Sequence, residues 1–166
     1  MVITYNFHLL MTILSEQFWR EKTLAEMSRS EWESLCDGCA RCCLIKLEDE
    51  ETSMVHYTGV VCRYLDQEAC RCTRYEDRTK LAPDCVQLTP DSALDYAWLP
   101  DTCAYRLVSE AKDLPSWHHL VSGDRDTVHK AGISVRGKCL SEEHVHPEAL
   151  EEQVIHWVQQ SGTVDG

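Results

Sequence analysis

Short amphipathic segments and polar turns alternate along this chain of 166 residues. Ser28 and Glu31 form an S-x-x-E capping box, which predicts a short helix that ends at about Leu35. We expect the chain to open into a loop at Gly38, because glycine is costly inside a helix and lets the backbone wrap closely around a ligand. An ordinary helix end at Gly38 is an equally good interpretation.

Residues 54–66, MVHYTGVVCRYLD, are rich in β-branched and aromatic side chains, which favours strands. They predict a short hairpin that turns near Gly59, with Cys62 on its second strand. The acidic residues 48–51 before it are typical of a solvated loop. A strand over residues 70–72 would place both cysteines of its C-x-C pair on one face, with the arginine opposite.

The second half of the chain predicts further short elements, from caps, prolines and apolar spacing. They are a helix over 90–98 after the N-cap Thr89, a helix over 102–108 capped by Asp101, a turn with Cys85, a Trp and His loop over 114–123, an isolated strand over 133–135 and a C-terminal helix over 147–158. Together these elements predict an α+β fold: a small cysteine-rich metal-binding domain with short helices and a β-hairpin around the cluster.

The length suits one domain, which we place at residues 16–166. Residues 1–15 are expected to be disordered or a gene-model extension, because Met11 can itself be a translation start. No internal repeat or low-complexity segment divides the rest.

The chain is acidic, with 28 acidic against 16 basic residues and a net charge of −12. This balance argues against nucleic-acid binding, which needs a basic surface to neutralise phosphates. The one local exception is a basic group within residues 63–80, namely Arg63, Arg71, Arg74, Arg78 and Lys80. Its arginines are either surface charge or an offset to nearby thiolates.

Ten cysteines dominate the chemistry, and four lie in the string CDGCARCC, residues 36–43. A secreted disulfide scaffold would need an export signal, and residues 2–14 lack a basic start and a cleavage site. They are also too short to span a bilayer. A thioredoxin-like motif would need a strand and helix context that is missing here. We therefore expect a cytoplasmic protein, with no membrane partner, whose thiols bind a metal ion.

Two kinds of metal centre fit the same cysteines. Cys36 and Cys39 form a C-x-x-C knuckle that, with two later cysteines, would hold a tetrahedral Zn²⁺. With Cys42 they also form C-x-x-C-x-x-C, the pattern that wraps three corners of an iron–sulfur cluster (4Fe-4S). The spacing leaves both cofactors open.

Histidines and enzyme motifs add little to this picture. His118 beside His119 could complete a mixed site, but neighbouring side chains rarely reach one metal, so a hydrogen-bonded histidine is the expected role. The sequence has no G-x-S-x-G, no H-E-x-x-H, no phosphate-binding glycine loop and no dinucleotide fingerprint. Whether the chain is an enzyme stays open.

CDGCARCC followed by CRYLD, CTRY and PDC resembles the CxxCxxCC family of zinc- or iron-chelating proteins. The segments FWREKTLAEMSRSEWESLCDGC, APDCVQLT, WLPDTCAYRL and KDLPSWHHLVSG are similar to its bacterial YcgN-like branch. The resemblance covers the chain from Phe18 to about Val135, and its cysteine spacing is specific.

The resemblance implies a set of ligands. The family's shared positions hold Cys36, Cys39, Cys42, Cys43, Cys62, Cys72 and Cys85, and Cys70 and Cys103 look like additions of the branch. The family pattern places a proline directly after the arginine, whereas here Thr79 to Ala82 separate Arg78 from Pro83, which leaves the role of Cys85 open. Cys139 lies outside the pattern and is expected to be an expendable thiol.

We therefore expect a metal-binding protein with a cysteine-ligated zinc or iron centre. The alternative is an iron–sulfur redox or radical-type enzyme, because some relatives carry the cysteines within methyl-transferring proteins. This chain shows no separate methyl-donor site.

Overall fold

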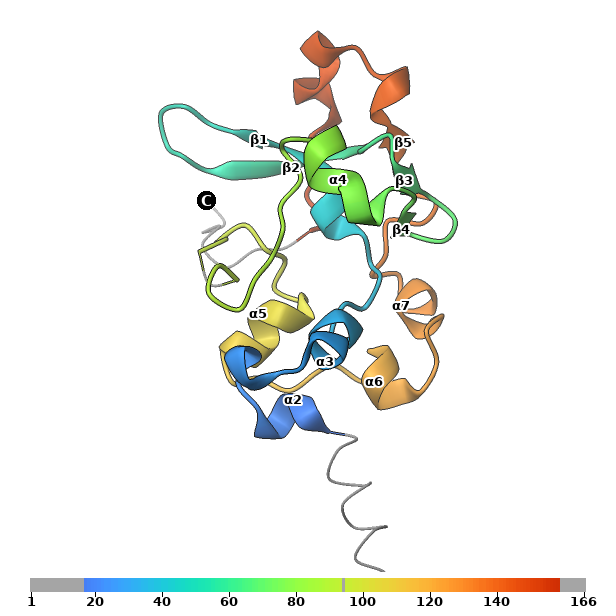
Figure 1. Cartoon of the computed structure of the whole chain (residues 1–166). Helices are drawn as coiled ribbons and strands as arrows, with labels where there is room; N and C mark the ends of the chain where they lie inside the picture. Colours follow the sequence, from blue (N-terminus) through green and yellow to red (C-terminus); the bar gives the residue numbers. More distant parts are fainter. Residues whose placement is uncertain (1–16, 94, 159–166) are drawn as a thin grey trace, which may run out of the picture.

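The structure is a computed structural model, and it describes residues 17–93 and 95–158. The expectation for residues 1–15 lies outside the described residues. Short helices and small sheets confirm the predicted α+β class (Figure 1). None of the described helices is both long enough and apolar enough to cross a membrane.

Regular elements are short throughout. The α-helices are α2 (Phe18–Glu21), α3 (Arg29–Ser34), α4 (Arg78–Leu81), α5 (Ala104–Ser109), α6 (His119–Ser122) and α7 (Thr127–Lys130). The 3₁₀ helices are η1 (Leu24–Glu26), η2 (Arg41–Cys43), η3 (Tyr75–Asp77), η4 (Glu142–His144), η5 (Pro147–Ala149) and η6 (Glu151–Gln153). The strands are β1 (Leu44–Glu48), β2 (Val55–Val61), β3 (Leu65–Asp66), β4 (Arg71–Cys72) and β5 (Leu140–Ser141).

The larger sheet has the order β1-β2-β5, with β1 antiparallel and β5 parallel to β2. The predicted hairpin is therefore displaced along the sequence. Gly59 lies inside β2, and the chain turns instead in the acidic segment, where Asp49 Oδ1 accepts hydrogen bonds from the amides of Glu51 (3.0 Å) and Thr52 (2.7 Å). This Asx-type turn explains why the acidic residues reverse the chain. Cys62 follows β2 rather than lying within a strand.

The helix before the cysteine string forms as predicted. Glu31 N donates to Ser28 Oγ (3.3 Å) and Ser28 N donates to Glu31 Oε2 (2.8 Å), so both halves of the capping box are present. The chain then opens into a loop, in which Gly38 (φ 78°) and Ala40 (φ 59°) have left-handed backbone. This arrangement confirms the loop expected at Gly38.

Several predicted elements are wrong, and tertiary contacts explain the clearest case. Residues 147–158 form η5 and η6 and then an extended segment, in which Ile155 N donates to Tyr57 O (2.8 Å) and Val154 pairs with Thr58 of β2. The sheet edge supplies hydrogen bonds that a C-terminal helix would supply internally.

The other corrections concern the predicted elements of the second half of the chain. The described part of 90–98 has only turns, and residues 133–135 form no strand. Helix α5 begins at Ala104 with Cys103, not Asp101, as its N-cap, and the predicted loop over 114–123 contains α6. Cys70 lies outside β4, with left-handed backbone (φ 52°), so the C-x-C pair does not alternate across a strand.

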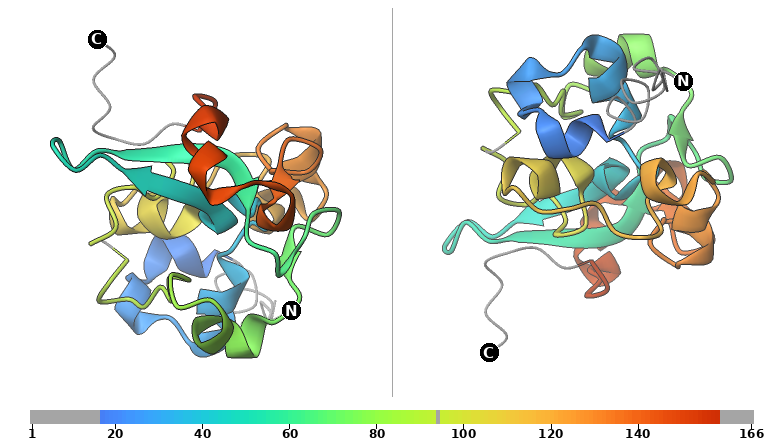
Figure 2. Two further views of the ribbon diagram at one scale, coloured as in Figure 1. Left: turned by 90° about the horizontal axis from the view of Figure 1, so that it is seen from above. Right: turned by 90° about the horizontal axis from the view of Figure 1, so that it is seen from below.

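Two hydrophobic clusters hold the chain together (Figures 1 and 2). The lower cluster joins α2, η1, α5 and the end of α3, and it includes Leu35. The upper cluster lies under the β1–β2 hairpin, and it includes Ala40 and Leu44. Residues 36–43 run from one cluster to the other, so the sequence CDGCARCC lies between them.

Candidate metal centre

The segment 36–43, here called the cysteine loop, is anchored at both ends by buried groups. Leu35 is fully buried, and its carbonyl lies 2.9 Å from His118 Nε2. Val135 N donates to Cys39 O (3.0 Å), which fixes the middle of the loop. All ten cysteines are free thiols. The residues Cys36 and Cys42 have exposed surface, although the surrounding loop still desolvates their sulfurs.

Four thiols gather around Asp37, and we call them the first thiol group: Cys36, Cys39, Cys42 and Cys103. Burial, and then the charge of Asp37, raises the pKa of Cys36 and of Cys39. Burial raises the pKa of Cys103 to about 12, with further contributions from Asp37 and Cys42. Cys103 interacts electrostatically with Asp37 and Cys42, which indicates that the start of α5 lies near the cysteine loop.

Backbone amides face these sulfurs. The amide of Gly38 lowers the pKa of Cys36, and the amide of Arg41 lowers that of Cys39, each against a larger effect of burial. The amides of Arg106 and Tyr105 act on Cys103 in the same way at the start of α5. N–H donors that stabilise a thiolate also stabilise a metal-bound sulfur, so this loop suits metal ligation.

Four thiols that interact with one another electrostatically form a second thiol group: Cys43, Cys62, Cys72 and Cys85. Burial raises the pKa of Cys85, Arg78 lowers it, and the thiols Cys42, Cys72 and Cys62 raise it further. Cys62 N donates to Cys43 O (3.1 Å), which holds the chain after β2 against the loop. Arg78 thus offsets charge at this group, one of the two roles open from the sequence.

The adjacent cysteines Cys42 and Cys43 join the two groups. The Cys43 thiol donates to Cys42, and this contact lowers the pKa of Cys42 and raises that of Cys43. Burial opposes the effect on Cys42, whereas the nearby ammonium of Lys46 supports it. Cys42 is therefore the thiol of the loop best prepared to ionise.

Two cations beside the thiols were not predicted from the sequence. Arg41 is buried; its Nε donates to Ile133 O (2.7 Å), and its guanidinium lies 5.6 Å from the Trp157 ring centroid. Lys46 Nζ donates to Cys42 O (2.9 Å) and Leu44 O (2.7 Å). The sequence indicates this role only through the position of each basic residue close to several cysteines in an otherwise acidic chain. The Lys46 ammonium offsets the charge of neighbouring thiolates.

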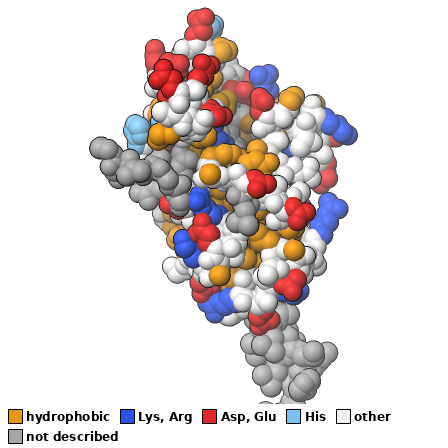
Figure 3. Space-filling view, turned by 90° about the vertical axis from the view of Figure 1, so that its left-hand side faces the viewer, with side chains coloured by type: hydrophobic (Ala, Val, Ile, Leu, Met, Phe, Trp, Pro, Cys, Tyr) orange, Lys and Arg blue, Asp and Glu red, His pale blue; other side chains and the backbone are white. Residues whose placement is uncertain are grey.

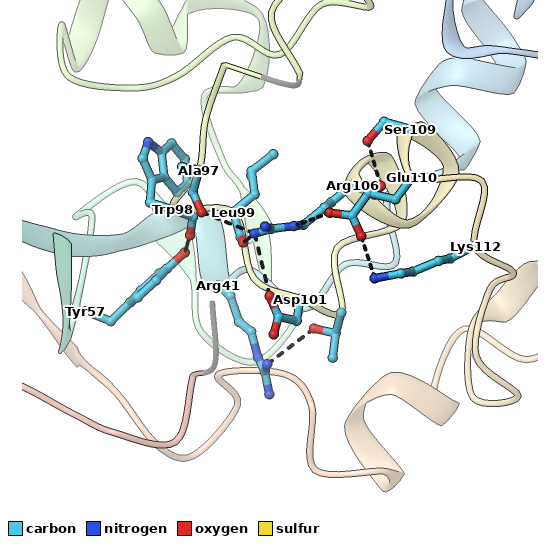
Figure 4. Close-up of polar contacts among 11 residues, drawn as sticks. Arg41, Tyr57, Ala97, Trp98, Leu99, Asp101, Arg106, Ser109, Glu110 and Lys112 are labelled. Atoms are coloured by element: carbon cyan, nitrogen blue, oxygen red, sulfur yellow. Dashed lines mark hydrogen bonds and ion pairs between the residues drawn. The ribbon is translucent and has the colours of Figure 1, made fainter. Parts of the chain in front are cut away.

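The segment before Cys103 is fastened by a polar network (Figure 4). Arg106 Nη1 donates to Leu99 O (2.6 Å) and Ala97 O (3.2 Å), and Tyr57 OH donates to Trp98 O (2.5 Å). Arg41 Nη1 donates to Thr102 Oγ1 (3.3 Å), directly beside Cys103. These contacts connect α5, β2 and the cysteine loop.

Cys70 has no electrostatic partner among the described thiols of either group. Cys70 is buried in the upper cluster, where its Sγ donates to Gln67 O (3.6 Å), and its interaction partners include Arg136 and Ser134. Cys139 packs beside it and donates to Gln67 Oε1 (3.7 Å). The assignment of Cys70 as a ligand stays a prediction from the sequence.

The histidine pair supports the loop rather than lining it. His118 is fully buried, and its Nδ1 accepts from Leu120 N (3.1 Å) while Nε2 faces Leu35 O. Both ring nitrogens are therefore engaged, and His118 fixes the entry to the cysteine loop. His119 stacks on it with ring centroids 4.5 Å apart, and its ring nitrogens are buried without a hydrogen bond among the described residues.

The donor chemistry fits a soft metal, although the side chains do not yet converge on one point. Across residues 17–93 and 95–158, no three His, Cys, Asp or Glu side chains have the arrangement of a metal site. The first thiol group nevertheless offers four sulfurs that interact electrostatically, with backbone amides and a buried carboxylate among them. Thiolates of this kind are the preferred ligands of zinc and of iron–sulfur clusters.

Residues 35–104 match the family CxxCxxCC, described as "Putative zinc- or iron-chelating domain". This range holds nine of the ten cysteines and leaves out Cys139. The chain is 57% identical over 141 residues to a UPF0260 protein of Marinobacter nauticus, with coverage of 85% of this chain and 95% of that protein.

Two further relatives give the same result. A UPF0260 protein of Ectopseudomonas mendocina is 59% identical over 141 residues, which are 85% of this chain and 95% of that protein. A UPF0260 protein of Pseudomonas aeruginosa is 55% identical over 140 residues, which are 84% and 94% of the two chains. No solved structure matches the chain. The family match supports metal binding.

Proposed function

We propose that this chain, which belongs to the UPF0260 family and carries the CxxCxxCC domain, binds zinc or iron through the thiolates of its cysteine loop. The observation that carries the proposal is that Cys36 interacts electrostatically with Asp37, with Cys42 and with the distant Cys103 at the start of α5. A four-ligand centre would draw on this distant cysteine together with the three closely spaced ones.

Each thiol group has its own place in the proposal. The first group supplies the primary centre, and the second group supplies either a second centre or the remaining ligands of a larger one. Lys46 and Arg78 offset the negative charge that either arrangement would gather. A bound Zn²⁺ would act structurally by tying the two hydrophobic clusters together, whereas a 4Fe-4S cluster would add one-electron chemistry.

Metal content and cysteine substitution test the proposal. The full chain, purified without oxygen, should contain zinc or iron in stoichiometric amount by mass spectrometry of the elements. Cys36→Ser and Cys103→Ser should lower that content, because serine lacks the soft sulfur. Cys139→Ser is the matched control and should keep it. A full metal complement in both loop variants, with loss in the control, would overturn the assignment.

Colour separates the two metals. A brown protein with broad visible absorption and acid-labile sulfide indicates the iron–sulfur cluster, and a colourless protein with one or two zinc ions indicates Zn²⁺. Either result identifies the cofactor, and the absence of both metals from the fresh protein refutes metal binding.

Partners and location complete the proposal. Ten free thiols suit a reducing compartment, so we place the protein in the cytoplasm as one domain over residues 16–166, with a metal ion as its partner.

Exposed glutamates of η5 and η6 gather at the top of the face in Figure 3 and add to the net charge of −12. Weak binding of RNA and duplex DNA is the expected result of fluorescence anisotropy at physiological salt; submicromolar, salt-sensitive binding would contradict it.

A further inference from the structure

Asp37 has a buried carboxylate, and one of its two oxygens accepts no hydrogen bond from the described residues. The residue is only 8% exposed, and its Oδ1 accepts a hydrogen bond from Cys39 N (2.8 Å). Its Oδ2 is buried and has no hydrogen-bond partner among the residues that the structure describes. Removing a carboxylate oxygen from water without a partner is costly, so such an atom points to a missing positive group.

The surroundings of Asp37 sharpen this point. Asp37 stands between Cys36 and Cys39 in the cysteine loop, and the hydrogen bond from Cys39 N holds its carboxylate within this run of thiols. The basic side chains closest to Asp37 in sequence or in interaction are engaged elsewhere. Arg41 donates to Ile133 O and Thr102 Oγ1, His118 Nε2 lies 2.9 Å from Leu35 O, and His129 Nδ1 lies 2.8 Å from Ser134 Oγ. In the described part of the chain, Asp37 has no ion pair with Lys, Arg or His within 4.0 Å.

We propose that Asp37 binds the metal directly through Oδ2, so that the centre has mixed sulfur and oxygen ligands instead of cysteine alone. This inference rests on the proposed function and names a ligand that the C-x-x-C spacing does not indicate. A carboxylate oxygen is an ordinary ligand of zinc and of iron. The Asx-type hydrogen bond that Cys39 N donates to Oδ1 orients the carboxylate and leaves its second oxygen available to a metal.

X-ray absorption of the Zn²⁺-loaded full chain tests the inference without any assay of activity. Wild type should show sulfur at about 2.3 Å and one oxygen at about 2.0–2.2 Å from the metal. Asp37→Cys should replace the oxygen with a further sulfur. Asp37→Asn should keep the fold and lower the affinity for Zn²⁺, measured against a competing chelator, by about 10- to 100-fold.

Asp66→Asn is the matched control. Asp66 makes the same kind of turn, with its Oδ1 accepting from Glu68 N (3.0 Å) and Ala69 N (2.9 Å), but it is exposed, so Zn²⁺ affinity should not change. Sulfur-only coordination in wild type, or an oxygen that persists in Asp37→Cys, would overturn the role of Asp37 while leaving metal binding intact. Wild type that binds no Zn²⁺ or iron overturns the proposed function and this assignment together.

Discussion

Lys46→Met should destabilise the protein by about 2–3 kcal/mol. Lys46 Nζ donates to the carbonyls of Cys42 and Leu44, and it lies 4.4 Å from the Trp98 ring centroid and 5.1 Å from that of Tyr57. Methionine keeps the unbranched stem and its packing but removes the ammonium.

The magnitude follows from these contacts. Each hydrogen bond contributes about 0.5–1.5 kcal/mol net, and a cation over an aromatic ring at a partly exposed position adds about 0.5–1 kcal/mol. Burial lowers the pKa of Lys46, and this desolvation cost subtracts from the total. The expected loss in the free energy of unfolding is still well above the change of about 0.5 kcal/mol that a typical surface substitution causes.

Urea unfolding of wild type and Lys46→Met measures the difference. Lys80→Met is the control, because Lys80 has an 81% exposed side chain and pairs only weakly with Asp77 (3.4 Å), so its change should stay within about 0.5 kcal/mol. The metal affinity of Lys46→Met should also fall about tenfold, since the ammonium lies beside Cys42, Cys43 and Cys85. Equal stability and equal metal affinity of Lys46→Met and wild type would refute the reasoning.

Three further outcomes are expected. The pKa of Asp113 is lowered to about 2, first by its bond with Arg20 and then by Trp19, so its contribution is complete above about pH 4 and is lost as the pH falls through 2. Because the pair is half exposed, Asp113→Asn should cost less than about 1 kcal/mol in urea unfolding at neutral pH, and a gap from wild type that persists at pH 2 would contradict this. Gly38→Ala should cost about 1–2 kcal/mol through its left-handed backbone, since an added Cβ meets no atom within 4 Å; an unchanged unfolding midpoint argues against it. A strong chelator should reduce the helix content seen by circular dichroism, whereas full metal removal with an unchanged spectrum would separate the fold from its metal.

Local signals predicted local structure well. The capping box of Ser28 and Glu31 forms α3 because its hydrogen bonds span only three residues, and Gly38 opens the loop because its backbone angle favours glycine. The C-terminal helix failed because Ile155 pairs with Tyr57, a contact between distant segments that apolar spacing does not encode. The hairpin was misplaced for the same reason: β-branched residues indicated a strand but not its partner.

The candidate site divides along similar lines. Spacing identified the cysteine loop, and resemblance added Cys103, which α5 then carries to Cys36. Asp37 and Arg41 lay within the motif but gave no signal, since a charged residue between cysteines is usually exposed. Only their burial in the fold distinguishes them from solvated charges.

Cys42 has a lowered pKa, and this property determines how the protein must be handled before its centre is filled. A thiolate is the form that peroxide and oxygen-derived species attack, so the lowered pKa makes Cys42 the thiol of the loop most open to oxidation. A bound metal would occupy the same lone pairs and protect them. In the newly made chain, metal binding therefore competes with oxidation of the thiols. The rate at which Cys42 is oxidised sets the time within which the metal must bind.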